Sequence, residues 1–444
     1  MTTTPMTPRV PEFTRALLYK ETSRGVDPGS PVGYVAQHRG EATYAAKQGT
    51  TSNPAFKGNV RSDDASYDPF DCSGSLPMWL DFDTSPLLFA TLASYTRIPL
   101  ATGSLHRMWV PAGVVTPASL QVQYEFLQST ARYMRQRNSW VKSLGLSLPT
   151  KGGVPLDCDF VGSGDTAFTD LGGTKTDNPY TSVTSFNSTV KVAGYTIQGL
   201  ADLKWMLTTN AMVDPVPTNA GVGIPRTGAI NVMTNLALRW ASAGGGLEQD
   251  FTLLNLGLAQ STFATDFLWA NLPILLATKW CRVIQPNNIA TVEPTVSGGT
   301  NGKTVKATIR MQDRGAKVAA EAFGTTKGPY AIVTGTNDKF SVAPDGGATV
   351  TVTLAANASL TVDALVALLN ADGGFAAKFI ADNFNGFPRV TSLQTGGTGA
   401  SSSVAFDTTV VHHCGTTMGF VSTVIPGVDT NLLVEFYNLQ NSNY

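Results

Sequence analysis

Charged residues are scarce in this sequence, and neither sign dominates. Of the 444 residues, 14% are Asp, Glu, Lys or Arg, and the formal net charge is −1, whereas an average soluble domain has roughly 25% charged residues. Binding to DNA or RNA phosphates needs a basic surface, so the composition argues against direct nucleic-acid binding. Low charge also fits a chain that covers its surface with copies of itself, because interface cores are depleted in charge.

Cysteine is rare, and its spacing excludes two common roles. The four cysteines lie far apart and include no C-x-x-C pair, so the sequence predicts neither a zinc site nor a disulfide framework. We expect reduced thiols in a protein made in the cytoplasm. They are Cys72, Cys158, Cys281 and Cys414.

Long hydrophobic runs, an export signal and catalytic signatures are missing as well. No apolar run approaches the ~18 residues of a membrane helix, and the first residues lack the pattern of a signal peptide. There is no G-x-S-x-G, Walker lysine motif or H-E-x-x-H. His412-His413-Cys414 cannot direct three adjacent strand side chains to one ion. We therefore expect no enzyme, no metal, no cofactor and no membrane partner.

What the sequence does have is the pattern of a β-rich protein. It contains 43 glycines and 25 prolines, which is typical of short strands joined by many turns. Alternation of apolar and polar residues, which places neighbours on opposite faces of a sheet, predicts many strands. The clearest lie at 106–111, 118–126, 195–207, 231–240, 303–311 and 432–438.

Two segments have helical patterns instead. Residues 85–95 predict a short helix with Ser85 as its cap and Pro86 in its first turn. Residues Phe251 to Phe263 fit either a strand or a helix, and we interpret them as a short helix. The segment 165–192 is poor in aliphatic residues and is expected to be a long loop of the functional or partner-ordered kind.

The stretch from Trp140 to Gly164, WVKSLGLSLPTKGGVPLDCDFVGSG, has the pattern of a β-hairpin. Apolar residues alternate with small or polar ones, interrupted only by Lys142, and a turn with two glycines joins the two halves. The core-facing side is expected to hold Trp140, Leu144, Leu146, Leu148, Val154, Leu156, Cys158 and Phe160, and the outer side Asp157 and Asp159.

A strand ending in L-x-L-x-L, a Gly-Gly turn and a return strand closing on F-V-G-S-G resemble the central hairpin of phage major tail tube proteins, from long non-contractile tails. The order continues with a long loop, a strand ending in Thr209-Asn210, a second strand and a helical stretch, which also resembles this family. A further likeness is the opening segment with Glu21, Gly25 and Pro28. The resemblance covers about residues 10–325.

The resemblance implies a mainly β fold, a β-sandwich or half-barrel with a short helix, over residues 1–330. It implies a structural virion protein whose copies close into rings of six and whose rings stack into a tube. This tube would conduct viral DNA into the host without specific binding. Implied partners are the tape measure, tail terminator and baseplate proteins. The implied location is the virion tail, assembled in the host bacterial cytoplasm. The candidate lumen-lining or inter-subunit residues are Trp140, Leu144, Leu146, Leu148, Asp157, Asp159 and Phe160.

The C-terminal part has a different rhythm. From residue 335 the pattern predicts a hairpin, a helix capped by Thr361 and further strands. This small α+β pattern resembles the repeat inserted in flagellar hook-associated proteins, and implies an outward decoration domain at 331–430. Residues 432–438 predict one more strand. Whether residues 431–444 return to the tube domain, which would make the small domain an insertion, stays open at this point.

The roles of two groups of charged residues stay open, and so does one alternative function. The acidic group, which lacks the spacing of a calcium loop, is interpreted as a solvated or subunit-facing loop. The basic group fits DNA phosphate or, preferably, salt bridges between subunits. These groups are Asp63, Asp64, Asp68 and Asp71, and Arg132, Arg135 and Arg137. The alternative function is a surface adhesin, or another phage structural protein, built of tandem β-domains.

Overall fold

The computed structural model describes most of the chain as a mainly β protein, which confirms the fold class expected from composition and alternation. The described residues are 13–52, 65–100, 103–111, 118–127, 132–149, 152–176, 183, 187–197, 200–214, 224–226, 228–239, 259, 261–271, 279–293, 306–313, 316–344, 347–384, 386–393, 403–420 and 425–438.

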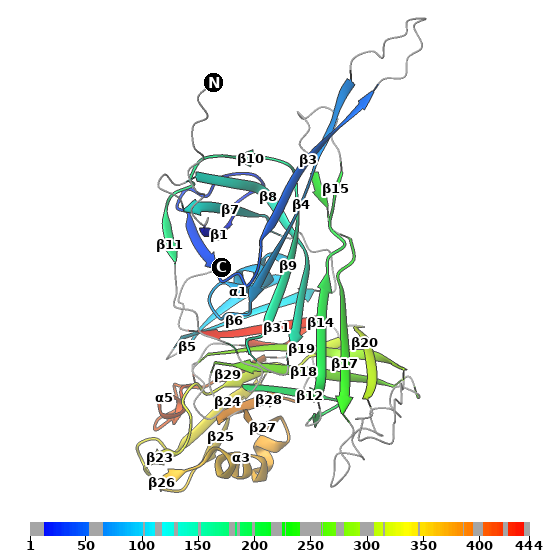
Figure 1. Ribbon diagram of the computed structural model, residues 1–444. Helices are drawn as coiled ribbons and strands as arrows, with labels where there is room; N and C mark the ends of the chain where they lie inside the picture. Colours follow the sequence, from blue (N-terminus) through cyan, green and yellow to red (C-terminus); the bar gives the residue numbers. More distant parts are fainter. Residues whose placement is uncertain are drawn as a thin grey trace, which may run out of the picture.

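Most of these strands belong to one curled sheet (Figure 1). Its first elements are β1 (Phe13–Lys20), β2 (Val32–Ala36), β3 (Thr43–Ser52), β4 (Ala65–Trp79), α1 (Ser85–Leu92, outside the sheet), β5 (Ser94–Leu100), β6 (Gly103–Pro111), β7 (Leu120–Leu127), β8 (Arg132–Leu148), β9 (Pro155–Gly162), β10 (Thr166–Ala167), β11 (Thr174–Thr176), β12 (Ser188–Val192) and β13 (Tyr195–Thr196). The later ones are β14 (Leu200–Thr208), β17 (Asn231–Arg239), β18 (Thr262–Ala270), β19 (Trp280–Glu293), β20 (Lys306–Asp313), β21 (Ala316–Val318) and β31 (Val428–Asn438). The strands β15 (Met212–Asp214) and β16 (Ile224–Arg226) form a separate pair.

The sheet folds over itself into two layers. The hairpin layer follows the order β3–β4–β9–β8–β14–β17–β20. The crossing layer follows β5–β6–β31–β19–β18–β12, and its strands cross those of the hairpin layer steeply (Figure 1). The two layers are continuous because β20 pairs with both β17 and the second half of β19. A sheet that curls in this way encloses a core between its own two halves.

The main core lies between these layers and around α1. All eight residues of α1 are buried, and the Phe89 ring lies 6.1 Å from Trp205 of the hairpin layer and 5.6 Å from Phe436 of the crossing layer. Full burial of a large apolar side chain contributes about 1.5–3 kcal/mol, so α1 stabilises the sandwich by filling its centre. A helix buried on every side needs no polar face.

The cap of α1 differs from the prediction. Pro86 is in the first turn as expected, but Ser85 is the first helical residue and Thr84, at the cap position, makes no side-chain capping bond. The carboxylate of Asp81 instead accepts bonds from the backbone N–H groups of Asp83 at 2.8 Å, Thr84 and Ser85 at 3.3 Å. A carboxylate does this work better than a hydroxyl because it carries negative charge to the positive end of the helix.

Three further expectations need correction. The segment 165–192 is not one loop, since it contains β10, β11 and β12, and β12 pairs with β18 over five residues. The strand expected at 195–207 is divided into β13 and β14. For the helix expected at Phe251 to Phe263, residues 251–258 lie outside the described residues and Thr262 and Phe263 begin β18.

A second, smaller unit is inserted between β21 and β31. Its elements are β22 (Glu321–Phe323), β23 (Tyr330–Ile332), β24 (Lys339–Pro344), β25 (Val350–Thr353), β26 (Asn357–Leu360), α3 (Val362–Ala371), α4 (Gly373–Ala376), β27 (Phe379–Phe384), β28 (Phe387–Ser392), β29 (Ser403–Phe406), α5 (Gly415–Met418) and β30 (Ile425–Pro426). The expected hairpin is present as β24 and β25, and Thr361 caps α3 by accepting from the Ala364 N–H at 3.2 Å.

The boundary of this unit lies earlier than residue 331. β22 pairs with β28 and packs into the second core, so the unit begins near residue 320. β31 pairs with β6, β19 and β21 of the large sheet. Val318 and Val428 are directly opposed partners where the chain leaves and re-enters that sheet. The small unit is therefore an insertion into a β-hairpin of the large one.

Candidate assembly surface

The predicted hairpin is formed by β8 and β9, with one extra residue in β8. The register shifts between Val141 and Ser143, so Lys142 is an additional residue with no partner in β9. Such a bulge moves the side chains on one side of it to the opposite face. Val141 therefore joins the main core with Leu144, while Trp140 lies in a separate cluster with Val161 and Ala211.

The bulge corrects the expected placement of Trp140, which does not share a face with the leucines that follow. Thr209 holds the bulge from the neighbouring turn: its hydroxyl donates to the Val141 carbonyl at 3.0 Å and to the Lys142 carbonyl at 3.1 Å, and its N–H donates to the Lys142 carbonyl at 2.9 Å. The lysine that interrupts the apolar pattern was the only sequence signal for this feature.

Most of the candidate site residues are interior. Leu144, Leu146, Leu148 and Phe160 are at most 8% exposed and belong to the main core. They cannot line a lumen or contact another subunit, because they close the hairpin layer onto α1 and the crossing layer. Trp140 is buried as well, with the Arg24 guanidinium 4.7 Å from its ring.

The outer face of the hairpin is small and polar. β8 presents Ser143, Gly145 and Ser147, and β9 presents Asp157 and Asp159, the two candidate residues that are exposed. Each carboxylate has a neighbour, since Ser143 Oγ donates to Asp159 Oδ2 at 2.6 Å and Arg39 Nη2 donates to Asp157 Oδ1 at 2.5 Å. The negative charges of Asp157 and Asp159 are thus partly balanced by these hydrogen-bond donors.

This face continues across two more strands. Met206 of β14 lies opposite Gly145 of β8 and opposite Met233 of β17, so the three form one cross-strand row. The two methionine side chains are 45% and 42% exposed, although methionine is normally a core residue. The outer face of the hairpin layer therefore displays two neighbouring exposed apolar side chains, and it extends beyond the predicted hairpin.

A two-stranded arm projects from the same layer (Figure 1). β4 pairs with β9 through residues 72–79, whereas its residues 65–71 pair only with β3 among the described strands. Within the described part of the chain, β3 in turn pairs only with β4. Two-stranded ribbons are marginal by themselves in water, and their unpaired N–H and C=O groups offer edges for another strand. The group Asp63, Asp64, Asp68 and Asp71 falls on this arm or outside the described residues.

Two of the three arginines that were expected to form salt bridges between subunits pair within the chain. Arg135 Nη1 lies 2.9 Å from Asp27 Oδ1, and Arg137 Nε lies 3.6 Å from Asp165 Oδ2. Arg132 is exposed and is the first residue of β8. The pairing of Arg135 and Arg137 with carboxylates that come from distant parts of the sequence removes the reason to assign them to a partner.

A buried charge cluster that the sequence did not reveal joins the small unit to the crossing layer. Arg282 of β19 lies 2.9 Å from Asp266, 2.7 Å from Glu321 of the small unit and 3.5 Å from Glu435. Arg107, itself 1% exposed, lies 2.8 Å from Glu435. Residues so far apart in sequence carry no local pattern, so only the folded chain brings them together.

The opposite charges in this cluster shift the pKa values of Glu321 and Arg282. Burial by itself would raise the pKa of Glu321, but the guanidinium groups of Arg282 and Arg389 hold that pKa below its ordinary value. Burial likewise opposes the charge of Arg282, and the carboxylates of Asp266 and Glu321 keep its pKa well above the ordinary value. Glu321 and Arg282 thus stabilise each other's charged forms, and their charge-assisted hydrogen bond fixes the small unit to the crossing layer.

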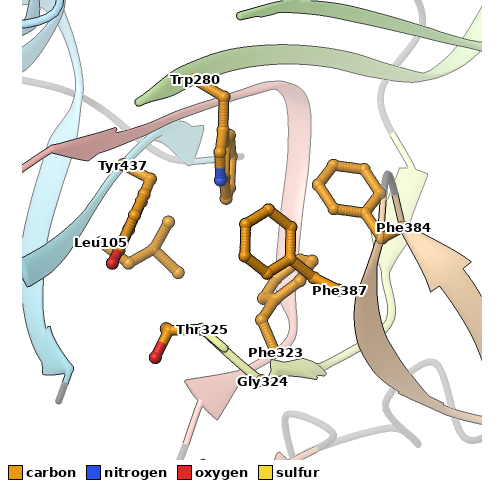
Figure 2. A pocket seen from close by; sticks show the side chains of 8 residues that line it. All are labelled: Leu105, Trp280, Phe323, Gly324, Thr325, Phe384, Phe387 and Tyr437. Atoms are coloured by element: carbon orange, nitrogen blue, oxygen red, sulfur yellow. The ribbon is translucent and has the colours of Figure 1, made fainter. Parts of the chain in front are cut away.

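Aromatic side chains complete this junction (Figure 2). Phe384 of the small unit lies between two guanidinium groups, with Arg282 at 5.0 Å and Arg389 at 4.9 Å from its ring centroid, and its edge meets Trp280 at 5.5 Å. The pocket drawn there has a free volume of about 10 Å³, which is the space of roughly one water molecule. It is a packing defect of the junction and too small for a substrate.

The histidine–cysteine cluster does not form a site. His412 adopts φ 64°, His413 accepts from the Gly415 N–H at 3.2 Å, and Cys414 is buried before α5. Within the described part of the chain, no three His, Cys, Asp or Glu side chains are grouped to hold a metal ion. No helix among the described residues is long and apolar enough to cross a membrane. All four cysteines are among the described residues; they are buried, and none forms a disulfide.

Comparison with known proteins adds no relative: no protein-family model matches the chain, and no curated protein is similar to it.

Proposed function

We propose that this chain is a structural subunit that assembles with copies of itself into the tail tube of a phage with a long non-contractile tail. The observation that carries the proposal is the arm of β3 and β4, in which residues 65–71 of β4 pair only with β3 among the described strands. Ribbons with open edges are completed by β-strand addition from a neighbour.

Two further features support assembly over catalysis. The outer face of the hairpin layer carries the exposed apolar side chains of Met206 and Met233 as cross-strand neighbours, whereas a catalytic site gathers a few convergent polar groups. The small unit is fixed rigidly by the Arg282 cluster, as a projection on a repeating structure needs to be. In a ring of six copies, the hairpin layer would face the channel and the small unit would project from the tube.

The first experiment is negative-stain electron microscopy of the concentrated protein beside size-exclusion chromatography. We expect rings or tubes with a central hole for the full chain. The matched variant lacks the arm: residues 48–70 are replaced by Asn-Gly, because Lys47 and Asp71 are directly opposed and a two-residue turn can join them. This variant should keep the β-sheet circular dichroism of the full chain and form no tubes.

Two results would oppose the proposal. A full chain that stays monomeric at every concentration would favour the alternative of a surface adhesin, which glycan arrays would then test. An armless variant that assembles as well as the full chain would remove the arm from the mechanism.

The role of the hairpin face can be read from methionine oxidation. Met206 and Met233 should react with hydrogen peroxide in the free subunit because they are exposed, while Met78, Met108 and Met418 are at most 1% exposed and serve as internal controls. Protection of the two exposed methionines in the assembly would place this face against a neighbour, and continued reaction would place it along the water-filled channel.

A further inference from the structure

We propose that residues 165–176, here called the strap, are a displaceable cover that holds the free subunit back from assembly. The strap leaves the hairpin after β9 and runs over the sheet formed by β1, β2, β7 and the first half of β8. A second copy would displace it from β2 and pair there in its place. This inference rests on the proposed self-assembly and adds its regulation.

The strap has short strand ladders and little apolar burial, and polar contacts make up most of its attachment. None of its residues is fully buried, and Phe168 is 74% exposed. β10 pairs with β8 over two residues, and β11 pairs in parallel with β2 over three. Its apolar anchor is Leu171, which is half-buried against Leu17, Tyr19 and Val35. Segments with few buried apolar contacts and short ladders are the ones that open locally.

The face beneath the strap is polar, although it is buried. Gln121 and Gln123 are 0% exposed and Glu125 is 1% exposed. The strap satisfies part of this face: Gln123 Nε2 donates to Asp170 Oδ1 at 2.7 Å, and Lys175 Nζ lies 2.5 Å from Glu125 Oε1. A face that stayed covered would be more stable with apolar residues. Glutamine and glutamate side chains are suited to a face that is alternately covered and hydrated.

Closing the strap also leaves polar groups without partners. The hydroxyl of Tyr19 and Nε of Arg135 are buried under or beside the strap and have no hydrogen-bond partner. Leaving a buried donor unsatisfied is costly, and opening the strap would let water reach both groups. Closing the strap therefore has an energetic cost, and this cost favours its release.

Release would expose the edge of β2 to a strand from a second copy. On its other edge β2 pairs with β1 through Ala36, Val35 and Tyr34, so it is already anchored in the sheet. The arm formed by β3 and β4 is a described segment with unpaired edges, and it projects away from its own subunit (Figure 1). The arm of the second copy is thus the strand that we assign to the vacated edge.

Two measurements test this proposal. Hydrogen exchange of the free full-length subunit should show the Leu171 and Thr174 amides, which donate to Gln123 Oε1 and the Pro31 carbonyl, with about 100-fold less protection than the β8–β9 ladder. Equal protection would overturn the strap as a separately opening segment, whether or not the protein assembles.

The second measurement is a disulfide lock between the strap and β2. Val32 and Thr174 are partners in the parallel ladder and both are exposed, and adjacent strands lie within the Cα separation that a disulfide spans. Oxidised Val32→Cys/Thr174→Cys protein should yield at least about 10-fold less sedimenting assembly than the same protein reduced, as expected for a locked minority state. The control lock is Lys339→Cys/Thr353→Cys in the small unit, where these residues are also ladder partners.

The outcomes separate the two proposals. Assembly that is lost on oxidation of the strap lock, restored on reduction and unaffected by the control lock supports the strap. Equal assembly of the oxidised and reduced strap lock overturns the strap and leaves the tube function standing. Failure of the wild-type chain to assemble is the failure of the proposed function, and hydrogen exchange then decides the strap by itself.

Discussion

At the scale of single residues, the most informative side chain is Asp81. It is buried at the entry to α1 and accepts three backbone N–H bonds. Burial raises the pKa of its carboxyl group to about 6, even though the N–H bonds from Thr84 and Asp83 lower it. Desolvation therefore outweighs the helix terminus, and the charged form of Asp81 is disfavoured in the folded chain.

The first prediction is a pH dependence that Asp81→Asn removes. Because the pKa is higher in the folded than in the unfolded chain, the stabilising contribution is complete below about pH 4 and is lost as pH rises through about 6. The full shift corresponds to about 3 kcal/mol. Asn keeps the accepting oxygen and has no titration, so the stability of Asp81→Asn relative to wild type should rise by about this amount between pH 4 and 7. Urea unfolding at several pH values measures it, and a difference that is independent of pH would contradict the raised pKa.

At the scale of elements, the alternation of residues was enough to predict the hairpin but not its bulge. Period-two patterns identify strands because each residue faces opposite to the last. They fail where one residue is added, since Lys142 shifts every side chain before it to the other face. The burial of α1 on all sides was equally hidden, because a pattern along the chain does not show what packs around a helix. The strap was unpredictable because its short ladders depend on polar partners supplied by distant strands.

The second prediction concerns the residue that holds the bulge. Thr209→Val removes the hydroxyl that donates to the Val141 and Lys142 carbonyls, and leaves buried acceptors with fewer donors. We expect a loss of about 1–3 kcal/mol in the free energy of unfolding. The control is Thr208→Val, since Thr208 is half-exposed at the end of β14, directly before Thr209, and should change stability by less than about 0.5 kcal/mol. Equal effects of the two substitutions in chemical denaturation would show that Thr209 does not support the bulge.

At the scale of the whole molecule, two units meet at a buried charge cluster that no pattern in the sequence indicated. Composition and alternation predicted a β-rich main part and a small α+β part, because both are properties of short segments. The junction depends on Arg282, Glu321 and Glu435, which only long-range folding brings together. The start of the small unit was misjudged for the same reason, since β22 shows its membership only through its pairing with β28.

The third prediction tests that junction. Arg282→Ala removes the cation that three carboxylates share, and it leaves Glu321 and Asp266 buried without it. Breaking a buried ion pair on one side costs about 3–5 kcal/mol, so thermal unfolding should begin far lower than in wild type. Arg39→Ala is the matched control, because its pair with Asp157 is exposed and exposed pairs contribute about 0–1 kcal/mol. A small effect of Arg282→Ala would mean that the aromatic contacts around Phe384 alone hold the units together.

The fourth prediction is that the small unit can be removed without loss of the large one. Val318 and Val428 are directly opposed in the β21–β31 ladder, so deleting residues 319–427 and joining these two valines through Asn-Gly should close an ordinary two-residue hairpin. The deletion uncovers Trp280 and Tyr437, which stack at 5.9 Å in the junction, so a second version also carries Trp280→Thr and Tyr437→Thr to prevent aggregation. Both versions should retain the β-sheet circular dichroism of the full chain, and the second should unfold cooperatively and assemble as the full chain does. This follows because the main core between the layers is built from side chains outside the deleted segment. Unfolded protein in both versions would mean that the insertion is part of the folding core of the large unit, whereas a folded variant that no longer assembles would assign the small unit a contact between subunits.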